Sequence, residues 1–167
     1  MVCFEELVDV IARLRAKDGC PWDREQTHMS LKAPCIEEAA EVICGINILD
    51  KTGNAENLKE ELGDLLLQVV MHAQIAKEEG LFNIEDVVRG ITEKMIRRHP
   101  HVFGEATVSD SGDVLRNWEA IKKYEKQGKI DDTEYLNEAF DESEMLIDVA
   151  RKRKAAKRKK NATEESL

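Results

Sequence analysis

Acidic residues occur in two short clusters whose spacing could build a metal site. The first comprises Glu37, Glu38 and Glu41, and the second comprises Glu61 and Asp64. On a helix, residues at positions i, i+1 and i+4 lie within about 100° of the circumference. Like charges at this spacing repel each other by about 0.2–0.5 kcal/mol per pair, and a bound cation would reverse that repulsion. The two clusters therefore indicate either a shared cation between neighbouring helices or two solvated acidic faces.

An all-carboxylate ligand set also indicates which metal and which chemistry to expect. Carboxylate oxygens suit Mg²⁺, with Mn²⁺ as a substitute, whereas zinc prefers thiolate and imidazole ligands. Magnesium held in this way keeps several waters and binds substrate phosphates, so the pattern predicts phosphate-ester or phosphoric-anhydride chemistry. Spacing alone does not separate this interpretation from an acidic surface without a ligand.

The context of the second cluster favours burial. Residues 62–76 are apolar almost all round, which predicts a central helix. Asp64, Gln68 and His72 nevertheless recur along this helix at i, i+4 spacing, and Glu61 precedes Asp64 by one turn. A buried carboxylate without a partner is costly. We therefore expect a cationic side chain or a metal beside Asp64, while Gln68 and His72 can equally be ordinary core polar groups.

Helices must position these residues, and the sequence predicts an all-α chain. Only nine glycines and three prolines interrupt the 167 residues. Apolar residues recur at helical spacing, and we find no strand-like alternation. The expected helices span 4–17, 31–49, 55–79, 84–98, 111–126 and 133–150. We expect Asn83 to cap the fourth of these helices and Pro100 to end it.

Charge is distributed unevenly along the chain. The formal net charge is −9, but residues 151–167 contain eight Lys and Arg against two Glu, so the first 150 residues carry −15. Such an acidic domain repels nucleic-acid phosphates, which argues against nucleic acid as a partner. We expect a catalytic domain over 1–126 and a charged C-terminal helix or tail over 127–167, its end disordered. The alternative for the tail is an electrostatic contact with nucleic acid or with an acidic partner subunit.

The cysteine pattern and the hydropathy indicate in which cellular compartment we expect the protein. Four cysteines form no C-x-x-C pair, and no Cys/His cluster indicates zinc, so we interpret them as reduced thiols of a cytoplasmic protein. No apolar run reaches 18 residues, and the first residues lack the pattern of a signal peptide. We expect no membrane span.

Four short blocks of sequence follow one another in a distinctive order. They are G-C-P-W-D with Q-T at 19–27, I-E-E-A-A-E-V at 36–42, E-L-G-D-L-L at 61–66 and R-R-H-P-H-V-F-G at 97–104. Together they resemble the MazG family over about residues 4–126. The resemblance implies an all-α helical bundle, a homodimer or dimer of dimers, that uses Mg²⁺ to hydrolyse NTPs or dNTPs to nucleoside monophosphate and pyrophosphate. A house-cleaning role against non-standard nucleotides is a further hypothesis.

The resemblance also implies roles for individual residues. Its metal-binding positions are Glu38, Glu41, Glu61 and Asp64, and its catalytic positions are Glu37 and Glu38, with Glu37 binding a second metal or orienting water. The resemblance further implies basic residues that bind the triphosphate and side chains that contact the base. The substrate-binding residues are Lys94, Arg97, Arg98, Trp118, Trp22 and Gln26.

Several of these residues have structural alternatives. Trp118 lies at helical spacing with apolar neighbours and can be a core residue, and Trp22 can simply hold its loop. Arg97 and Arg98 can stabilise the C-terminal end of a helix, where cations are favoured.

Two other functions compete with hydrolysis. A non-enzymatic helical interaction module would bind partners through its acidic surface and basic tail. A di-iron bundle needs two E-x-x-H motifs, and the chain has one, from Glu25 to His28. Longer members of the family carry two MazG domains, and here a charged tail of roughly 40 residues follows the first.

Overall fold

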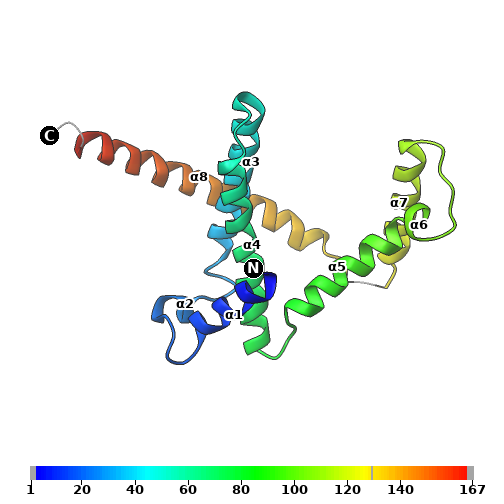
Figure 1. Ribbon diagram of the computed structural model, residues 1–167, viewed down its shortest axis with the longest axis horizontal. Helices are drawn as coiled ribbons and strands as arrows, with labels where there is room; N and C mark the ends of the chain where they lie inside the picture. The colour runs from blue at the N-terminus through cyan, green and yellow to red at the C-terminus, as the bar shows by residue number, and fades with distance from the viewer. Residues whose placement is uncertain (1–2, 129, 165–167) are drawn as a thin grey trace. The chain divides into compact units, whose positions relative to one another are not determined.

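The structure is a computed structural model that describes residues 3–128 and 130–164, with side chains up to residue 157. All regular secondary structure within these ranges is helical, which confirms the all-α prediction (Figure 1). The helices are α1 (Phe4–Arg15), α2 (Pro21–Glu25), α3 (Lys32–Thr52), α4 (Glu56–Glu78), α5 (Ile84–Arg98), α6 (Pro100–Phe103), α7 (Ser111–Glu125) and α8 (Thr133–Glu164).

The helix boundaries differ from the predicted ones in two ways. The short helices α2 and α6 were not predicted, and each begins with a proline, whose fixed φ suits the first helical position. Helix α8 continues to Glu164 instead of ending near 150. Its last turns are rich in Lys, Arg and Ala, all strong helix formers, so the loss of apolar periodicity there did not mark the end of the helix. The predicted disorder at the very end falls on residues 165–167, outside the described residues.

The chain divides into two compact units, which we describe separately. Unit 1 comprises Met1–Leu81 and Tyr135–Leu167, and unit 2 comprises Phe82–Glu134. Most of α8, which lies within the predicted tail over 127–167, belongs to the same unit as α1–α4. Whether residues 1–126 suffice for catalysis stays a prediction.

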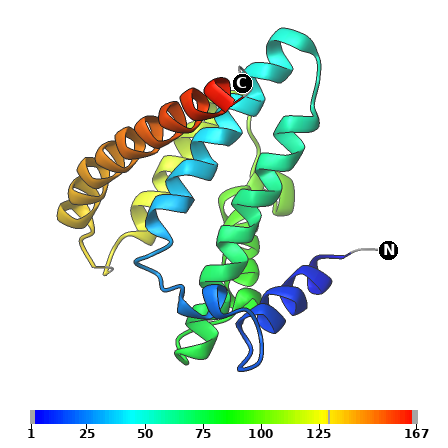
Figure 2. The same cartoon turned by 90° about the vertical axis from the view of Figure 1, so that its left-hand side faces the viewer.

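The α3–α4 helical hairpin is the framework of unit 1. Gly53 ends α3 in the left-handed conformation (φ 74°), and the two helices then run side by side (Figure 2). They approach closely at Gly45, where an added Cβ would lie 2.7 Å from the Leu58 Cα. Helix α1 packs against the C-terminal half of α4, and the fully buried residues Ile11 and Val70 lie in this core.

Helix α4 packs against α3 and α1, but within the single chain it is not buried on all sides. Its core face includes Val70, Ala73 and Ile75, but Leu62 is 50% exposed and Leu66 is 39% exposed. The carboxylate with the lowest exposure on this helix is Glu61, at 8%, whereas Asp64 is more accessible. A helix that is apolar all round therefore has one face free within the single chain.

Unit 2 consists of α5, α6 and α7. Asn83 caps α5 as predicted, and it forms a capping box in which Asp86 bonds back to the Asn83 backbone N–H. The His99-Pro100 pair ends α5 and begins α6. Asp110 accepts a hydrogen bond from the Asp113 backbone N–H at the start of α7.

Two further predictions concern the cysteines and the absence of a membrane-spanning helix. All four cysteines, which lie within the described residues, are free thiols. None of the helices in the described part of the chain combines the length and the apolar character that a membrane crossing requires.

The close approach at Gly45 gives the first prediction. Gly45→Ala should destabilise the chain by about 1–3 kcal/mol in urea denaturation, because the new methyl group would overlap the backbone of Leu58. Gly90→Ala is the matched control: it is also a helical glycine, but its added Cβ meets nothing within 4 Å. This control should be neutral or stabilise by up to about 1 kcal/mol through helix propensity. Equal stability of Gly45→Ala and the parent chain would contradict the packing.

Candidate functional site: a carboxylate cluster on α3 and α4

Three predicted metal ligands come together across the α3–α4 hairpin. Carboxylate oxygens of Glu38, Glu61 and Asp64 all lie within 4.8 Å of one another. Glu38 comes from α3, and the other two come from adjacent turns of α4. The side chain of Asn57, one turn before Glu61, donates a hydrogen bond of 2.8 Å to Glu61 Oε1 and so orients its carboxylate.

Electrostatics within this cluster favour a bound cation. The pKa of Glu38 is raised above its usual value, first because partial burial disfavours the charged form and then because Glu41, Asp64 and Glu61 repel it. The cluster therefore concentrates negative charge at one place, and a divalent cation would offset it.

The other two glutamates of α3 are paired with basic residues of α8. Lys154 Nζ binds Glu41 Oε1, and Arg153 Nη2 binds Glu37 Oε2. The predicted fourth metal ligand, Glu41, thus lies one turn from Glu38 on α3, but its carboxylate is shared with a lysine. Glu37, the predicted water-orienting residue, is likewise engaged by an arginine.

The atoms around the cluster fit a hard, oxygen-preferring metal. All three clustered side chains are carboxylates, the ligand type that Mg²⁺ and Mn²⁺ prefer. Asn57 Oδ1 and Gln68 Oε1 are buried oxygens without a hydrogen-bond partner, and these residues lie one turn before Glu61 and one turn after Asp64. Such unpaired acceptors are unusual in a folded protein, and a hydrated cation nearby would supply donors for them.

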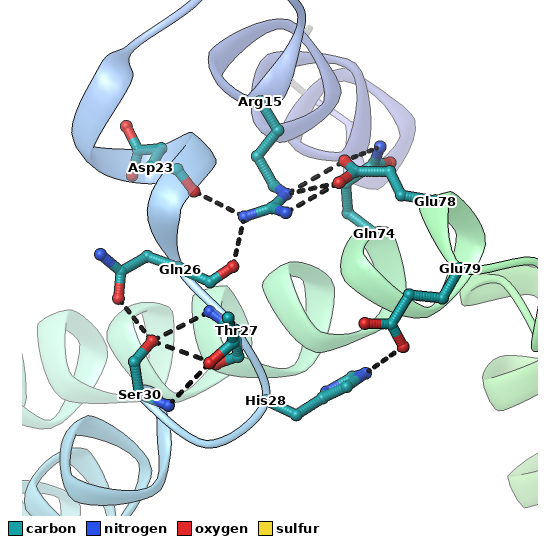
Figure 3. A network of polar contacts seen from close by, with 9 residues as sticks. All are labelled: Arg15, Asp23, Gln26, Thr27, His28, Ser30, Gln74, Glu78 and Glu79. Atoms are coloured by element: carbon teal, nitrogen blue, oxygen red, sulfur yellow. Dashed lines mark hydrogen bonds and ion pairs between the residues drawn. The ribbon is translucent and has the colours of Figure 1, made fainter.

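Residues 19–31 form a loop that includes the short helix α2, and this loop carries Trp22 and Gln26 and is held by one arginine (Figure 3). Arg15, on α1, has a side chain only 6% exposed. Its Nη1 donates to the carbonyl oxygens of Asp23 (2.5 Å) and Gln26 (3.1 Å), and its Nε and Nη2 donate to the Glu78 carboxylate at 3.0 and 2.7 Å. Arg15 therefore joins α1, this loop and the end of α4.

The two predicted base-binding residues of this loop differ in whether their side chains are available to a ligand. The Trp22 side chain is exposed, with 65% of the residue accessible. The Gln26 side chain is engaged within the loop: it donates to the Trp22 carbonyl oxygen at 3.0 Å and accepts from Ser30 Oγ at 2.8 Å. Gln26 thus shapes the loop, and Trp22 has the accessible ring.

His28, in this loop, contacts His72 of α4. The Nδ1 atoms of His28 and His72 are 2.8 Å apart, and their rings stack with centroids 5.1 Å apart. Burial, together with the charge of His28, lowers the pKa of His72. Glu79 lies 3.7 Å from His28 Nε2. His72 is therefore not an isolated core residue, and it joins α4 to the loop before α3.

The predicted phosphate-binding cations lie in unit 2, and two of them are paired. Glu125 accepts hydrogen bonds from Arg97 Nε (2.6 Å) and Arg98 Nη2 (2.6 Å), and these bonds lower the pKa of Glu125 to about 2. Arg98 also lies over the Trp118 ring, 5.1 Å from its centroid, and His99 meets the same ring edge-on. Arg98 and Trp118 thus form one packed group, while Lys94 is half-buried on α5.

Comparisons with known proteins identify a family for the part of the chain that holds the carboxylate cluster. Residues 26–103 match the family described as the MazG nucleotide pyrophosphohydrolase domain. Residues 26–103 therefore form a MazG domain. This domain contains the whole carboxylate cluster together with Gln26, Lys94, Arg97 and Arg98, whereas Trp22, Trp118 and α8 lie outside the matched range.

Longer proteins are similar to this chain over most of its length. The chain is 53% identical over 128 residues to a nucleoside triphosphate pyrophosphohydrolase/pyrophosphatase MazG of Thermotoga maritima, covering 77% of this chain and 47% of that protein. It is 42% identical over 127 residues to a nucleoside triphosphate pyrophosphohydrolase of Escherichia coli, with 75% and 47% covered. It is also 53% identical over 123 residues to the uncharacterized protein YabN of Bacillus subtilis, with 74% and 24% covered. The chain spans half the length or less of these three relatives.

Sequence reasoning missed the partners that hold the site residues of the MazG domain. Arg15, Glu125, Arg153 and Lys154 are each separated from at least one partner by 27 residues or more. Helical periodicity relates residues within a few turns, so it gives no signal for such pairs. Only the charge excess of the tail hinted that α8 could meet an acidic surface.

The buried position of Arg15 gives the second prediction. Arg15→Ala should destabilise the chain at pH 7 by about 2 kcal/mol in urea denaturation, because it removes a charged donor from Glu78 and from two backbone carbonyls. Arg13→Ala is the control, since the Arg13–Asp18 pair is exposed on both sides and should be worth less than about 1 kcal/mol.

The same variant has a defined pH dependence. Arg15 lowers the pKa of Glu78 below its ordinary value of 4.5, so the ion pair stabilises the folded chain above that pH. This stabilisation is lost as the pH falls through the lowered pKa. The difference between the parent chain and Arg15→Ala should therefore narrow from pH 6 to pH 3. A difference that stays constant would mean that the Glu78 pair contributes nothing.

Proposed function

We propose that this MazG domain hydrolyses nucleoside triphosphates, NTPs or dNTPs, to nucleoside monophosphate and pyrophosphate with the help of Mg²⁺. The observation that carries the proposal is the cluster of Glu38, Glu61 and Asp64, which places three carboxylates from two helices around one point. The names of the Thermotoga maritima and Escherichia coli relatives support the same activity.

We assign two roles to the acidic residues, metal binding and orientation of the attacking water. Glu38, Glu61 and Asp64 would hold the metal, and Glu41 would join them when Lys154 leaves it. The bound metal offsets the charge of the triphosphate and polarises its phosphoryl oxygens. Glu37 and Glu38, on the face of α3 beside the cluster, would orient the attacking water as a general base does. Asn57 keeps the Glu61 carboxylate in place through its hydrogen bond.

The substrate also needs cations and a surface for its base. We assign Lys94, Arg97 and Arg98 to the phosphates, because guanidinium and ammonium groups match phosphate oxygens. Glu125 pre-orients both arginines, at the expense of part of their charge. Trp22 is assigned to the base because its ring is exposed, and Trp118 would assist by holding Arg98.

We further propose that two copies of the chain associate through the uncovered faces of α3 and α4. Ile43 is 60% exposed, Ile46 is 49% exposed and Leu62 is 50% exposed. Apolar side chains of this size gain free energy when a second surface excludes water from them. A homodimer, or a dimer of dimers, would bury them.

Hydrolysis is tested by separating the products formed from each common NTP and dNTP, with the metal ligands substituted. The parent chain should yield monophosphate and pyrophosphate with Mg²⁺ only. Glu38→Gln and Asp64→Asn should each lower kcat at least about 100-fold, because one charged metal ligand is lost. Glu60→Gln is the control: it removes an exposed charge from the same helix outside the cluster, and it should keep activity within about threefold.

Two outcomes would overturn this assignment. Diphosphate and orthophosphate as products would mean a different phosphohydrolase. Full activity of both Glu38→Gln and Asp64→Asn, with the fold intact by circular dichroism, would mean that the cluster is not the metal site.

Association is tested by light scattering at micromolar concentration. The parent chain should have at least twice the mass of one chain. Leu62→Lys should give monomers, because a buried lysine would have to lose its hydration at the interface. Leu136→Lys, a substitution at an equally exposed leucine of α8, should leave the mass unchanged. A monomeric parent chain would contradict the proposed interface.

A further inference from the structure

Two basic residues of α8 lie directly on the acidic face of α3. Arg153 binds Glu37 and Lys154 binds Glu41, although each pair is separated by more than 110 residues in the sequence. A third ion pair, of 2.7 Å between Lys32 Nζ and Glu142 Oε2, joins the start of α3 to an earlier turn of α8. Helix α8 crosses α3 in the view of Figure 1, and its last turns lie near α3 in Figure 2.

The carboxylates of these pairs are partly buried, whereas the side chains of Arg153 and Lys154 are 65% and 43% exposed. The Glu37 side chain is 12% exposed and the Glu41 side chain is 32% exposed. A charge that is partly removed from water is screened less, so its interaction with a nearby cation is stronger. The interaction between the basic residues of α8 and these carboxylates is therefore only partly screened by water.

The influence of α8 reaches the clustered carboxylates. Glu38 and Glu41 lie on adjacent turns of α3, and Glu38 belongs to the cluster whose carboxylate oxygens lie within 4.8 Å of one another. The positive charge that Lys154 places at Glu41 is therefore also close to Glu38. The lysine thus compensates part of the repulsion that a metal ion would otherwise relieve.

We propose that Arg153 and Lys154 are tethered counterions of the metal site, which occupy Glu37 and Glu41 and which a divalent cation has to displace. This inference rests on the proposed metal-dependent function. Glu41 cannot give its full charge to a metal while it binds Lys154. Because the lysine is part of the same chain, it is always present at a high effective concentration. Helix α8 therefore weakens metal binding and sets the concentration at which the site fills.

The test measures metal binding without any nucleotide. Mn²⁺ is the probe, and its free concentration is followed by electron paramagnetic resonance during titration of the full chain. The double substitution Arg153→Ala/Lys154→Ala should tighten Mn²⁺ binding at least about fivefold, since two positive charges near a dication are removed. Lys154→Gln alone should give a smaller shift in the same direction.

A matched control separates local pairing from net charge. Arg151→Ala/Lys152→Ala removes the same charge from the same helix, but Arg151 pairs with Asp148 within α8 and Lys152 is exposed. This control should bind Mn²⁺ within about twofold of the parent chain.

The possible failures are distinguishable. Unchanged or weaker Mn²⁺ binding by Arg153→Ala/Lys154→Ala, with binding by the parent chain intact, would overturn the counterion role alone. An equal gain in the control would also overturn it, because net charge would then explain the effect. Absence of Mn²⁺ binding in every variant would overturn the metal site and this inference together. Binding that appears only when Arg153 and Lys154 are replaced would be the strongest support.

Discussion

Carboxylates that face each other across α3 and α4 repel, and the arrangement of unit 1 depends on how that repulsion is offset. Apolar packing brings the two helices together, and Gly45 allows the closest approach. The same packing forces Glu38, Glu61 and Asp64 to within 4.8 Å of one another. Asn57, Arg153 and Lys154 then supply hydrogen bonds and positive charge around the cluster. A metal bound by the cluster and the basic residues of α8 would each offset the same repulsion.

Ion pairs also position the residues that we predict to bind the substrate. Arg15 holds the backbone of the loop that presents Trp22, and Glu125 holds Arg97 and Arg98. In each case one buried or nearly buried ionic group fixes the geometry of residues that have more freedom. A chain with few aromatic residues, 5% of its length, thus relies on ion pairs to organise its polar surfaces.

Local sequence patterns predicted the helices and the carboxylate cluster, because both depend on spacing within a few turns. The capping of α5 by Asn83 and the clustering of Glu61 with Asp64 are of this kind. The apolar residues all round α4 predicted a buried helix, but they do not say whether a neighbour that covers it comes from the same chain or from a second one. The partners of Arg98 and of Glu41 could not be predicted, because nothing local in one sequence relates α5 to α7 or α3 to α8.

The most direct test of the metal site is anomalous diffraction from crystals soaked in Mn²⁺. Our account predicts an anomalous peak at about 2.0–2.3 Å from carboxylate oxygens of Glu38, Glu61 and Asp64, the range expected for a hard divalent cation on oxygen ligands. Glu41 should have turned from Lys154 toward the same peak. A peak at another site, or well-ordered Glu38, Glu61 and Asp64 side chains without a peak at saturating Mn²⁺, would contradict it.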